Sequence, residues 1–569
     1  MKKLVILIII ICASILAGIL IPKKSVYFIF EYSGYYFIFV SFLLWVVSLL
    51  NLTSSKLKSL ILQHWPALLL CTTLMVFIFC LAPPKFKILN DETNLIGVSM
   101  SMYRSKKVSL PIQGINLDYK KLEYKNSLDK RPLLFPLLVS FVHGLRGYSA
   151  FNGFVVNFFC GILVLFIFYL FIYDHFPRIY ALLSILIVAS LPNFVFWVTS
   201  SGFEVLNLLF IIITIFLFNR VIVTRNIQQA ELLFLTLVLV SQCRYESVVF
   251  TTAILFLLPI LLKKESISDW SIITFISPVL FIPIIWLNRL YADLPVVNKL
   301  AANVAQLPNL YEAFNFSNLL SNTPPNLMVL LGLDPHMGFS WLISAMSIAG
   351  IYLMTKRLIV DFRGASVQFK TMWFFGVLTF SLLYFIQVSF YLGNMAIYTQ
   401  NRFAMAYLPY MVLPAIFFVH EVLKKTSNTK KIFVSIFFVS HLFFFWPYGS
   451  QQLLVNTGAI PYEYNKTLRY IKDNFKSNSD ILVISERPYL YTVHYSGAVD
   501  FAYANQNTEK ILDQYRKDFD HILVLQKCLY KTQAPLTSSR LSSTYPLIQM
   551  GVLNLTRSEY LQISEIIKE

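Results

Sequence analysis

Apolar runs of about 18–25 residues, separated by short polar stretches, recur along most of this chain. A helix of that length is long enough to cross the hydrocarbon core of a bilayer. The 569 residues are 57% hydrophobic and only 13% charged, and a water-soluble fold of this size could not bury so much apolar surface. The sequence therefore predicts a polytopic α-helical membrane protein.

Basic residues indicate on which side of the membrane each loop lies. Lys2 and Lys3 precede the first apolar run, and basic pairs return in later short loops, as at Lys263–Lys264 and Lys430–Lys431. Because cytoplasmic loops are enriched in Lys and Arg, we expect a cytoplasmic N-terminus, about 13 transmembrane helices and a C-terminal part outside the cell or in the periplasm. The net charge of +18 follows from these loops, so no nucleic-acid partner is expected.

The composition of the chain changes near residue 448, where apolar runs become shorter and charges more frequent. Residues 481–485 and 521–525 are typical of short buried strands, and residues 462–475 and 507–519 are typical of amphipathic helices. We therefore predict two parts. Residues 1–447 form a transmembrane catalytic module with a large exoplasmic loop at about 83–149, and residues 448–569 form a small exoplasmic α/β domain.

Two adjacent carboxylates, Asp91 and Glu92, open the large loop just after an apolar run. Acidic groups beside a bilayer are costly unless they face water, a cation or a substrate. A carboxylate at this boundary can serve as a base toward a hydroxyl or an amine. The alternatives are a hydrated turn, or a cap by Asp91 on an interfacial helix that the spacing of apolar residues predicts between Glu92 and Arg104.

Cations occur where the same face of the membrane is expected. Lys130 and Arg131 end the large loop, and Arg402 begins a late apolar run. A planar guanidinium suits bidentate contact with a phosphate, so these residues are candidates for binding a lipid phosphate. Each is also explained as an interfacial residue whose charged end reaches water.

Further ionisable residues are candidates for supporting roles. Glu204, at the outer end of an apolar run, would be a second carboxylate of the site or a simple interfacial group. Arg244 and Glu246 flank a break between two short apolar segments, where mutual neutralisation is the favoured interpretation and a role beside the acceptor is the alternative. Asp334 and His336 are weak metal-ligand candidates, because two residues do not make a metal site.

In their order along the chain these stretches resemble the GT-C glycosyltransferases, and within them the protein O-mannosyltransferase and lipid A aminoarabinose transferase relatives. The resemblance covers roughly residues 65–425 and departs from the family pattern in two ways: two extra apolar runs precede the acid pair, and Glu204 stands where the family typically has Asp. It rests on Asp91-Glu92-Thr93, Lys130-Arg131-Pro132-Leu133-Leu134-Phe135-Pro136, the stretch from Gly144 to Asn152, Leu191-Pro192, Arg402-Phe403 and Leu408-Pro409.

The resemblance implies a polyprenyl-phosphate-linked sugar as donor, with its phosphate near Arg131 and Arg402. A hydroxyl or amine of an acceptor lipid, glycan or protein would attack the anomeric carbon in one inverting displacement. Asp91 would accept the proton and Glu92 would orient groups beside it. Some members of the class use a divalent metal and others do not, so no cofactor is assigned. We expect an integral protein of a bacterial inner or plasma membrane, in contact with membrane lipids.

Two other functions fit parts of the pattern. A transporter or flippase of lipid-linked glycans predicts a repeat relating two halves and broken helices at mid-membrane, and no repeat is apparent. A polysaccharide polymerase or ligase would share the donor type, but its large loop is expected late in the chain. The transferase is therefore the leading hypothesis.

Overall fold

The computed structural model describes most of the chain. The described residues are 2–53, 57–117, 121–261, 275–293, 314–333, 340–424, 432, 436, 440, 459–476, 479–542, 544–556 and 558–567. They fall into two compact units. Unit 1 comprises Met1–Pro84, Lys130–Leu137 and Phe154–Asn456, and unit 2 comprises Lys85–Asp129, Leu138–Gly153 and Thr457–Glu569.

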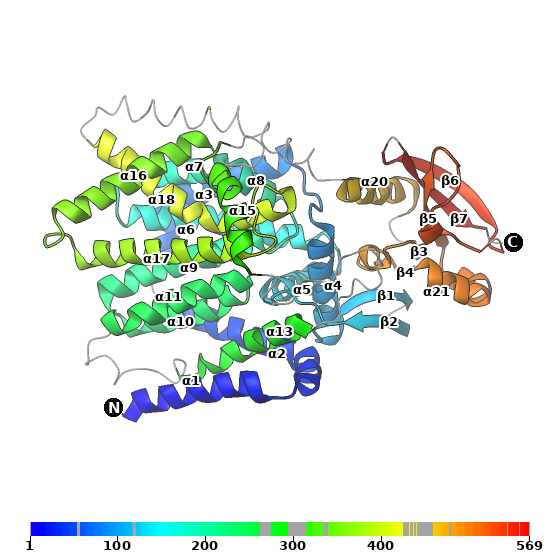
Figure 1. The fold of residues 1–569 in the computed structure, drawn as a ribbon, viewed down its shortest axis with the longest axis horizontal. Coiled ribbons are helices and arrows are strands. Elements are labelled where there is room, and N and C mark those ends of the chain that lie inside the picture. Colours follow the sequence, from blue (N-terminus) through cyan, green and yellow to red (C-terminus); the bar gives the residue numbers. More distant parts are fainter. Residues whose placement is uncertain are drawn as a thin grey trace. The chain divides into compact units, whose positions relative to one another are not determined.

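Unit 1 is a bundle of helices whose long members lie side by side (Figure 1). These helices coincide with the apolar runs, because a helix satisfies its own backbone hydrogen bonds where no water is available. Their bounds are α1 (Lys2–Leu20), α2 (Lys23–Thr53), α3 (Leu57–Leu81), α6 (Asn152–Tyr173), α7 (Arg178–Ser190), α8 (Pro192–Val198), α9 (Glu204–Thr224), α10 (Ile227–Ser241), η1 (Tyr245–Ser247), α11 (Val248–Leu261), η3 (Val279–Phe281), α13 (Ile282–Asp293), α15 (Phe316–Leu330), α16 (Trp341–Val360), α17 (Val367–Ser389), η5 (Tyr398–Tyr407) and α18 (Leu408–Leu423).

Within the described ranges, seven helices are long and apolar enough to cross a membrane. An eighth candidate is the pair α7 and α8, which is bent by 70° at Leu191–Pro192. Shorter apolar helices, such as Ile227–Ser241, accompany them. The predicted class of polytopic helical membrane protein is confirmed. The count of about 13 spans remains a prediction, since most of the last expected span (432–447) lies outside the described residues.

The expected break between two short apolar segments is present. Helix α10 ends at Ser241 and α11 begins at Val248, with the short helical turn η1 between them. Helix α5 (Leu134–Arg146) has residues in both units. The backbone N–H of Leu134 at its start donates to the carbonyl of Gln242, at 3.2 Å. This bond ties the backbone that follows Arg131 to the break between α10 and α11.

Unit 2 is built on one seven-stranded sheet with the order β2-β1-β4-β3-β5-β7-β6. Its central strands β4, β3 and β5 are parallel, and the strands toward both edges are antiparallel. Its elements are α4 (Leu89–Ser105), β1 (Leu110–Leu117), β2 (Lys121–Ser127), α20 (Ala459–Asn474), β3 (Ile481–Ile484), η6 (Pro488–Leu490), β4 (Gly497–Val499), α21 (Phe501–Gln506), the π-helical turn η7 (Lys510–Tyr515), α22 (Arg516–Asp518), β5 (His521–Leu529), η8 (Thr537–Ser539), β6 (Leu547–Asn554) and β7 (Glu559–Ile566).

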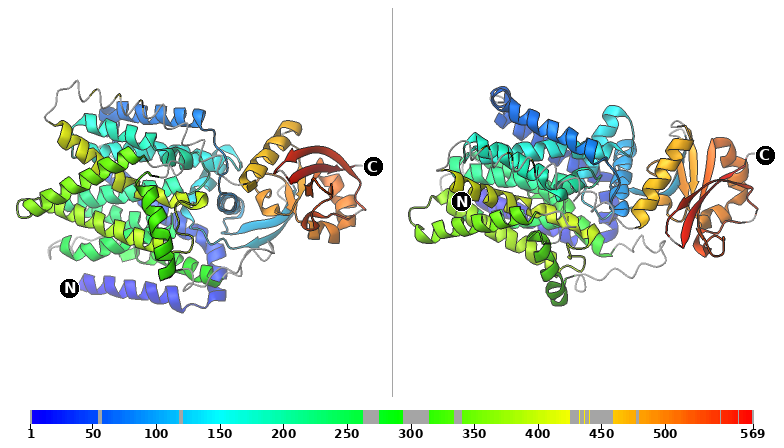
Figure 2. Two further views of the ribbon diagram at one scale, coloured as in Figure 1. Left: turned by 45° about the horizontal axis from the view of Figure 1, so that its top comes forward. Right: turned by 90° about the horizontal axis from the view of Figure 1, so that it is seen from above.

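Helices cover both faces of this sheet, with α20 and α21 on opposite sides (Figure 2). The side chains of Leu482 and Ile484 are buried with Ile511 and Phe519 from the helical segment around η7. The predicted buried strands at 481–485 and 521–525 are confirmed as β3 and β5. Alternating helices and strands thus give the small α/β fold that the sequence indicated.

The hairpin of β1 and β2 belongs to the same sheet, although it comes from the loop between α4 and α5. Gly114 and Ile115 of β1 pair with Ala498 and Gly497 of β4. The sequence analysis did not foresee these strands. It did foresee the helix before them, which is α4. The first large loop and the last part of the chain therefore form one unit.

Candidate active site

The predicted acid pair lies in the first turn of α4 in unit 2. Asp91 is half-buried, and Glu92 is almost fully buried with 2% of its surface exposed. The residue that precedes the helix, Ile88, has no polar side chain that could cap it. The carboxylate of Glu92 takes over this task, because its Oε2 accepts hydrogen bonds from the backbone N–H of Ile88, at 2.6 Å, and of Lys87. Glu92 thus satisfies backbone donors that a helix start leaves unpaired.

Lys87 lies beside this cap and is also buried, with 1% of its surface exposed. Burial lowers the pKa of Lys87 to about 7, while the carboxylate of Glu92 acts in the opposite direction. The sequence analysis did not single out Lys87. Its position shows that the acid pair is embedded in a partly buried charged environment, with Asp91 as the more accessible of the two carboxylates.

The tail segment of unit 2 contacts the start of α4 directly. The hydroxyl of Tyr489, in η6, donates to Oδ1 of Asn90 at 3.1 Å. Nδ2 of Asn465, in α20, donates to the carbonyl of Phe86 at 2.9 Å. The residue next to Asp91 is therefore held by a segment that the sequence analysis had placed in a separate domain.

A second cluster of ionisable residues lies in unit 1 and brings together Glu204, Arg244, Glu246 and Arg402. Oε1 of Glu204 is 3.5 Å from Nη1 of Arg244 and 3.8 Å from Nη1 of Arg402. Nε of Arg244 is 2.6 Å from Oε1 of Glu246. Two guanidinium groups therefore share one carboxylate, and Arg244 lies between two acids. The side chains of Glu204 and Arg244 are only 3% and 6% exposed, compared with 13% for Arg402.

Two phenylalanines line this cluster. The guanidinium carbon of Arg244 lies 4.5 Å from the ring centroid of Phe403 and 5.0 Å from that of Phe203. The guanidinium carbon of Arg402 lies 5.5 Å from the Phe403 ring. Cation–π contacts of this kind orient a guanidinium without neutralising its charge. Phe203 and Phe403 directly precede and follow Glu204 and Arg402, so their proximity could have been suspected from the sequence.

Three helix ends hold the cluster in place by polar contacts between buried side chains. Nδ2 of Asn157, in α6, donates to the carbonyls of Ser200 and Gly202 at 2.8 Å each. A Cβ added to Gly202 would lie 2.1 Å from Oε2 of Glu204, so glycine leaves the space that this carboxylate fills. Further bonds join Asn193 to Asn401, beside Arg402, and Ser247 to Asn207.

The remaining candidates fall in different places. Lys130 and Arg131 belong to unit 1, where Arg131 is buried with 7% of its surface exposed. Asp334 and His336 lie outside the described residues. Among the described residues, no group of three or more His, Cys, Asp or Glu side chains could hold a metal ion. The structure thus gathers four predicted residues in one cluster of unit 1 and places Asp91 and Glu92 in unit 2.

The buried histidine of unit 2 gives a prediction for the pH dependence of stability. Nε2 of His494 is 2.6 Å from the hydroxyl oxygen of Tyr464, and burial lowers the pKa of His494 to about 3. The unfolded chain protonates this group near pH 6.5. Stability is therefore lost as the pH falls from about 6.5 toward 3, by at most about 1.4 kcal/mol per pH unit. Thermal unfolding of His494→Gln at pH 7 and pH 4.5 should show a weaker pH dependence than the wild type.

A His521→Gln variant is the control for the loss of an imidazole elsewhere in unit 2. His521 lies on β5, where its Nδ1 is 2.7 Å from Oε1 of Glu565. An acid sensitivity that is the same in His494→Gln and in the wild type would show that His494 does not cause it.

Comparison with known proteins follows from this geometry. Residues 130–286 match a family model described as dolichyl-phosphate-mannose-protein mannosyltransferase. A search of curated proteins found no match.

Solved structures that align with the chain include three membrane enzymes. ArnT from Cupriavidus metallidurans, bound to undecaprenyl phosphate, is 9% identical, with 87% of this chain and 97% of that chain covered and a TM-score of 0.48. The Archaeoglobus fulgidus oligosaccharyltransferase tethered with an acceptor peptide is 10% identical, with 81% and 69% covered and a TM-score of 0.47. The arabinosyltransferase EmbB from Mycobacterium smegmatis is 10% identical, with 69% and 41% covered and a TM-score of 0.34.

The family match spans the segment that contains Arg131, Glu204, Arg244 and Glu246. It agrees with the resemblance that the sequence motifs indicated. The chain is therefore a membrane glycosyltransferase of the GT-C superfamily, a class that uses sugars carried on lipid phosphates.

Proposed function

We propose that this enzyme transfers a sugar from a polyprenyl-phosphate donor to an acceptor on the exoplasmic face of the membrane, by a single inverting displacement. The observation that carries the proposal is the arginine–glutamate cluster of unit 1, at the start of two candidate spans. Ionisable residues within membrane helices are costly and mark functional sites. Two arginines that share Glu204 form a charged cluster suited to a lipid phosphate.

The donor phosphate is assigned to Arg402, with Arg131 and Lys130 as further cations. Arg244 is held at 2.6 Å by Glu246, whereas Arg402 is 3.8 Å from Glu204 and is the more exposed of the two arginines. A guanidinium can bind two phosphate oxygens at once. Negative charge grows on the leaving phosphate during the reaction, so a positioned cation there lowers the barrier.

Asp91 is assigned as the base. The acceptor oxygen or nitrogen attacks the anomeric carbon of the sugar, the bond from that carbon to the phosphate oxygen breaks, and polyprenyl phosphate leaves with the electron pair. The proton of the acceptor passes to the carboxylate of Asp91. Glu92 caps the backbone ahead of α4, and we assign it the role of orienting Asp91 through this backbone. A divalent metal remains open as an additional group at the phosphate.

The experiment is a transfer assay with the full-length protein in lipid nanodiscs. Polyprenyl phosphates carrying different sugars are supplied with cell-envelope extracts, and the release of polyprenyl phosphate is measured together with the product's anomeric configuration by NMR. Release that depends on the protein, with an inverted product, is the expected result. Movement of intact lipid-linked sugar across vesicles, with no release of polyprenyl phosphate, would contradict it and indicate a flippase. A product of retained configuration would contradict the single displacement.

Replacement of Arg402 tests the phosphate assignment. Arg402→Gln removes the charge and the bidentate contact, so we expect the KM for the lipid-linked donor to rise about 10- to 100-fold. Arg402→Lys keeps the charge without the planar fork and should fall between the two. Steady-state kinetics with varied donor concentration measure this effect. An unchanged donor KM in both variants would remove Arg402 from the phosphate site.

A further inference from the structure

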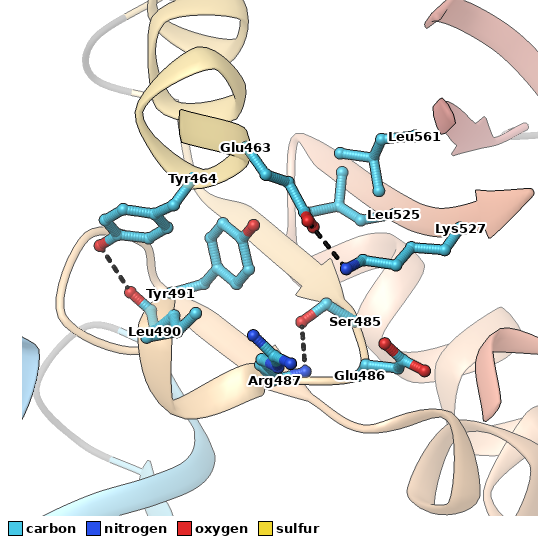
Figure 3. Close-up of a pocket in the computed structure, with 10 residues that line it drawn as sticks. All are labelled: Glu463, Tyr464, Ser485, Glu486, Arg487, Leu490, Tyr491, Leu525, Lys527 and Leu561. Atoms are coloured by element: carbon cyan, nitrogen blue, oxygen red, sulfur yellow. Dashed lines mark hydrogen bonds and ion pairs between the residues drawn. The ribbon is translucent and has the colours of Figure 1, made fainter. Parts of the chain in front are cut away.

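A hollow in unit 2 lies where the parallel strands β3 and β5 end (Figure 3). Ser485 follows the last residue of β3, and Lys527 lies three positions beyond Val524, the last residue of β5 that pairs with β3. In sheets of parallel strands, ligands bind outside the carboxyl ends of the strands. The hollow has a volume of about 380 Å³, including solvent at its open side, which is near the lower end of the range for small-molecule sites.

Charged groups of both signs line this hollow in equal number. Oε2 of Glu463, from α20, is 2.8 Å from Nζ of Lys527, and the two side chains are 15% and 17% exposed. Glu486 and Arg487 supply a second acid and a second base from the loop after β3. The hydroxyl oxygen of Ser485 accepts a hydrogen bond from the backbone N–H of Arg487 at 3.1 Å. The lining therefore carries no net charge, which disfavours a phosphate or another anion.

An aromatic and apolar surface completes the lining. The ring of Tyr491 lies close to Glu463 (Figure 3), and the buried side chains of Leu490, Leu525 and Leu561 line the same hollow. An apolar lining that contains a tyrosine ring, bordered by carboxylates that accept and cations that donate hydrogen bonds, suits a ring with one apolar face and many hydroxyl groups. A sugar ring has this chemistry.

The same loop that lines the hollow also contacts the helix of Asp91. Glu486 and Arg487 are followed at once by η6, in which Tyr489 donates to Oδ1 of Asn90. Asn90 precedes Asp91 in the chain. A ligand in the hollow would therefore bind to a loop that is fastened to the residue beside the assigned base.

We propose that this hollow binds a saccharide ring of the acceptor, so that the acceptor is a glycan or a glycan-bearing lipid. This inference rests on the proposed function for the term acceptor, while the binding itself does not depend on catalysis. Glu463 and Lys527 contact the hydroxyl groups of the ring, and Tyr491 contacts its apolar face. Asp91 is not part of the hollow.

The test is ligand-observed saturation-transfer NMR with the full-length protein in nanodiscs, which avoids detergents with sugar headgroups. The probes are the methyl glycosides of mannose, glucose, galactose and N-acetylglucosamine, and inorganic phosphate is added as a competitor. At least one glycoside should bind to the wild type without competition by phosphate. No signal from any of the four, or displacement by phosphate, would overturn the inference.

Two variants separate binding from folding. The double variant Glu463→Lys with Lys527→Glu keeps an ion pair and reverses its direction, and Ser485→Ala leaves the pair intact. Both should weaken glycoside binding about tenfold. The matched control is Glu565→Gln, which removes the His521–Glu565 pair on neighbouring strands of the same sheet and should bind as the wild type does. Wild-type binding by the double variant and by Ser485→Ala would overturn the inference.

The outcome is distinguishable from that of the proposed function. Asp91→Asn should bind the glycosides as the wild type does, because it leaves the hollow unchanged. Selective glycoside binding without any transfer from lipid-linked donors would retain the hollow and contradict the function. Transfer with an acceptor KM that the hollow variants leave unchanged would retain the function and contradict the hollow as an acceptor site.

Discussion

Replacement of Asp91 by Asn is expected to reduce the rate of sugar transfer by a factor of about 10²–10⁴, the usual contribution of a general base. Asparagine has nearly the same size and keeps one oxygen in place, but it cannot accept the proton of the acceptor. Asp91 is half-buried in the first turn of α4, so the change should leave folding intact. The measurement is kcat in nanodiscs at saturating donor, together with the thermal unfolding temperature.

Two variants act as controls for this result. Asp91→Glu keeps a carboxylate at a displaced position and should retain more activity than Asp91→Asn. Asp473→Asn removes an exposed carboxylate on α20, 60% of whose side-chain surface is accessible, and should transfer sugar as the wild type does. If Asp91→Asn retained wild-type kcat with normal expression, another group would have to be the base.

The second large effect is expected on stability, from Glu204→Gln. Both Arg244 and Arg402 lie within 4 Å of Oε1 of this buried carboxylate. Removal of its charge leaves two buried cations near one another with Glu246 as the one remaining acid of the cluster. Breaking a buried ion pair from one side costs about 3–5 kcal/mol, so we expect a decrease of that size in the free energy of unfolding.

An exposed ion pair in the same unit provides the comparison. Nη2 of Arg220 is 2.6 Å from Oδ1 of Asp174, and these side chains are 40% and 23% exposed. Asp174→Asn should cost about 1 kcal/mol or less, because solvent screens the pair. Chemical unfolding of both variants in the same bilayer mimetic measures the difference. Equal losses would mean that the cluster around Glu204 contributes no more than a surface contact.

The helices of unit 1 could be predicted from the sequence because a bilayer permits few alternatives. Twenty or more apolar residues between basic loops leave a helix as the only economical structure, as for the run that became α6. Glu204 and Arg402 could likewise be singled out, because an ionisable residue at the edge of such a run requires an explanation.

Other features depend on contacts between distant parts of the chain. Strand β1 contains Pro111 and Gly114, which weaken the pattern of a strand, and it is completed by pairing with β4. The cap formed by Glu92 depends on the path of the backbone at Lys87 and Ile88. The sharing of Glu204 by Arg244 and Arg402 requires three segments to meet. Sequence spacing alone contains none of this information.

The pairing of β1 with β4 has a consequence for biosynthesis. Tyr489 is 399 residues away in the chain from Asn90, which it holds. A ribosome that has made the helix of Asp91 must therefore produce nearly all of the remaining protein before that helix acquires its native neighbours. Contacts of such long sequence separation form late and slowly. The enzyme is thus expected to stay inactive in the membrane until its last domain has been exported and folded, which protects lipid-linked sugars from a half-made transferase.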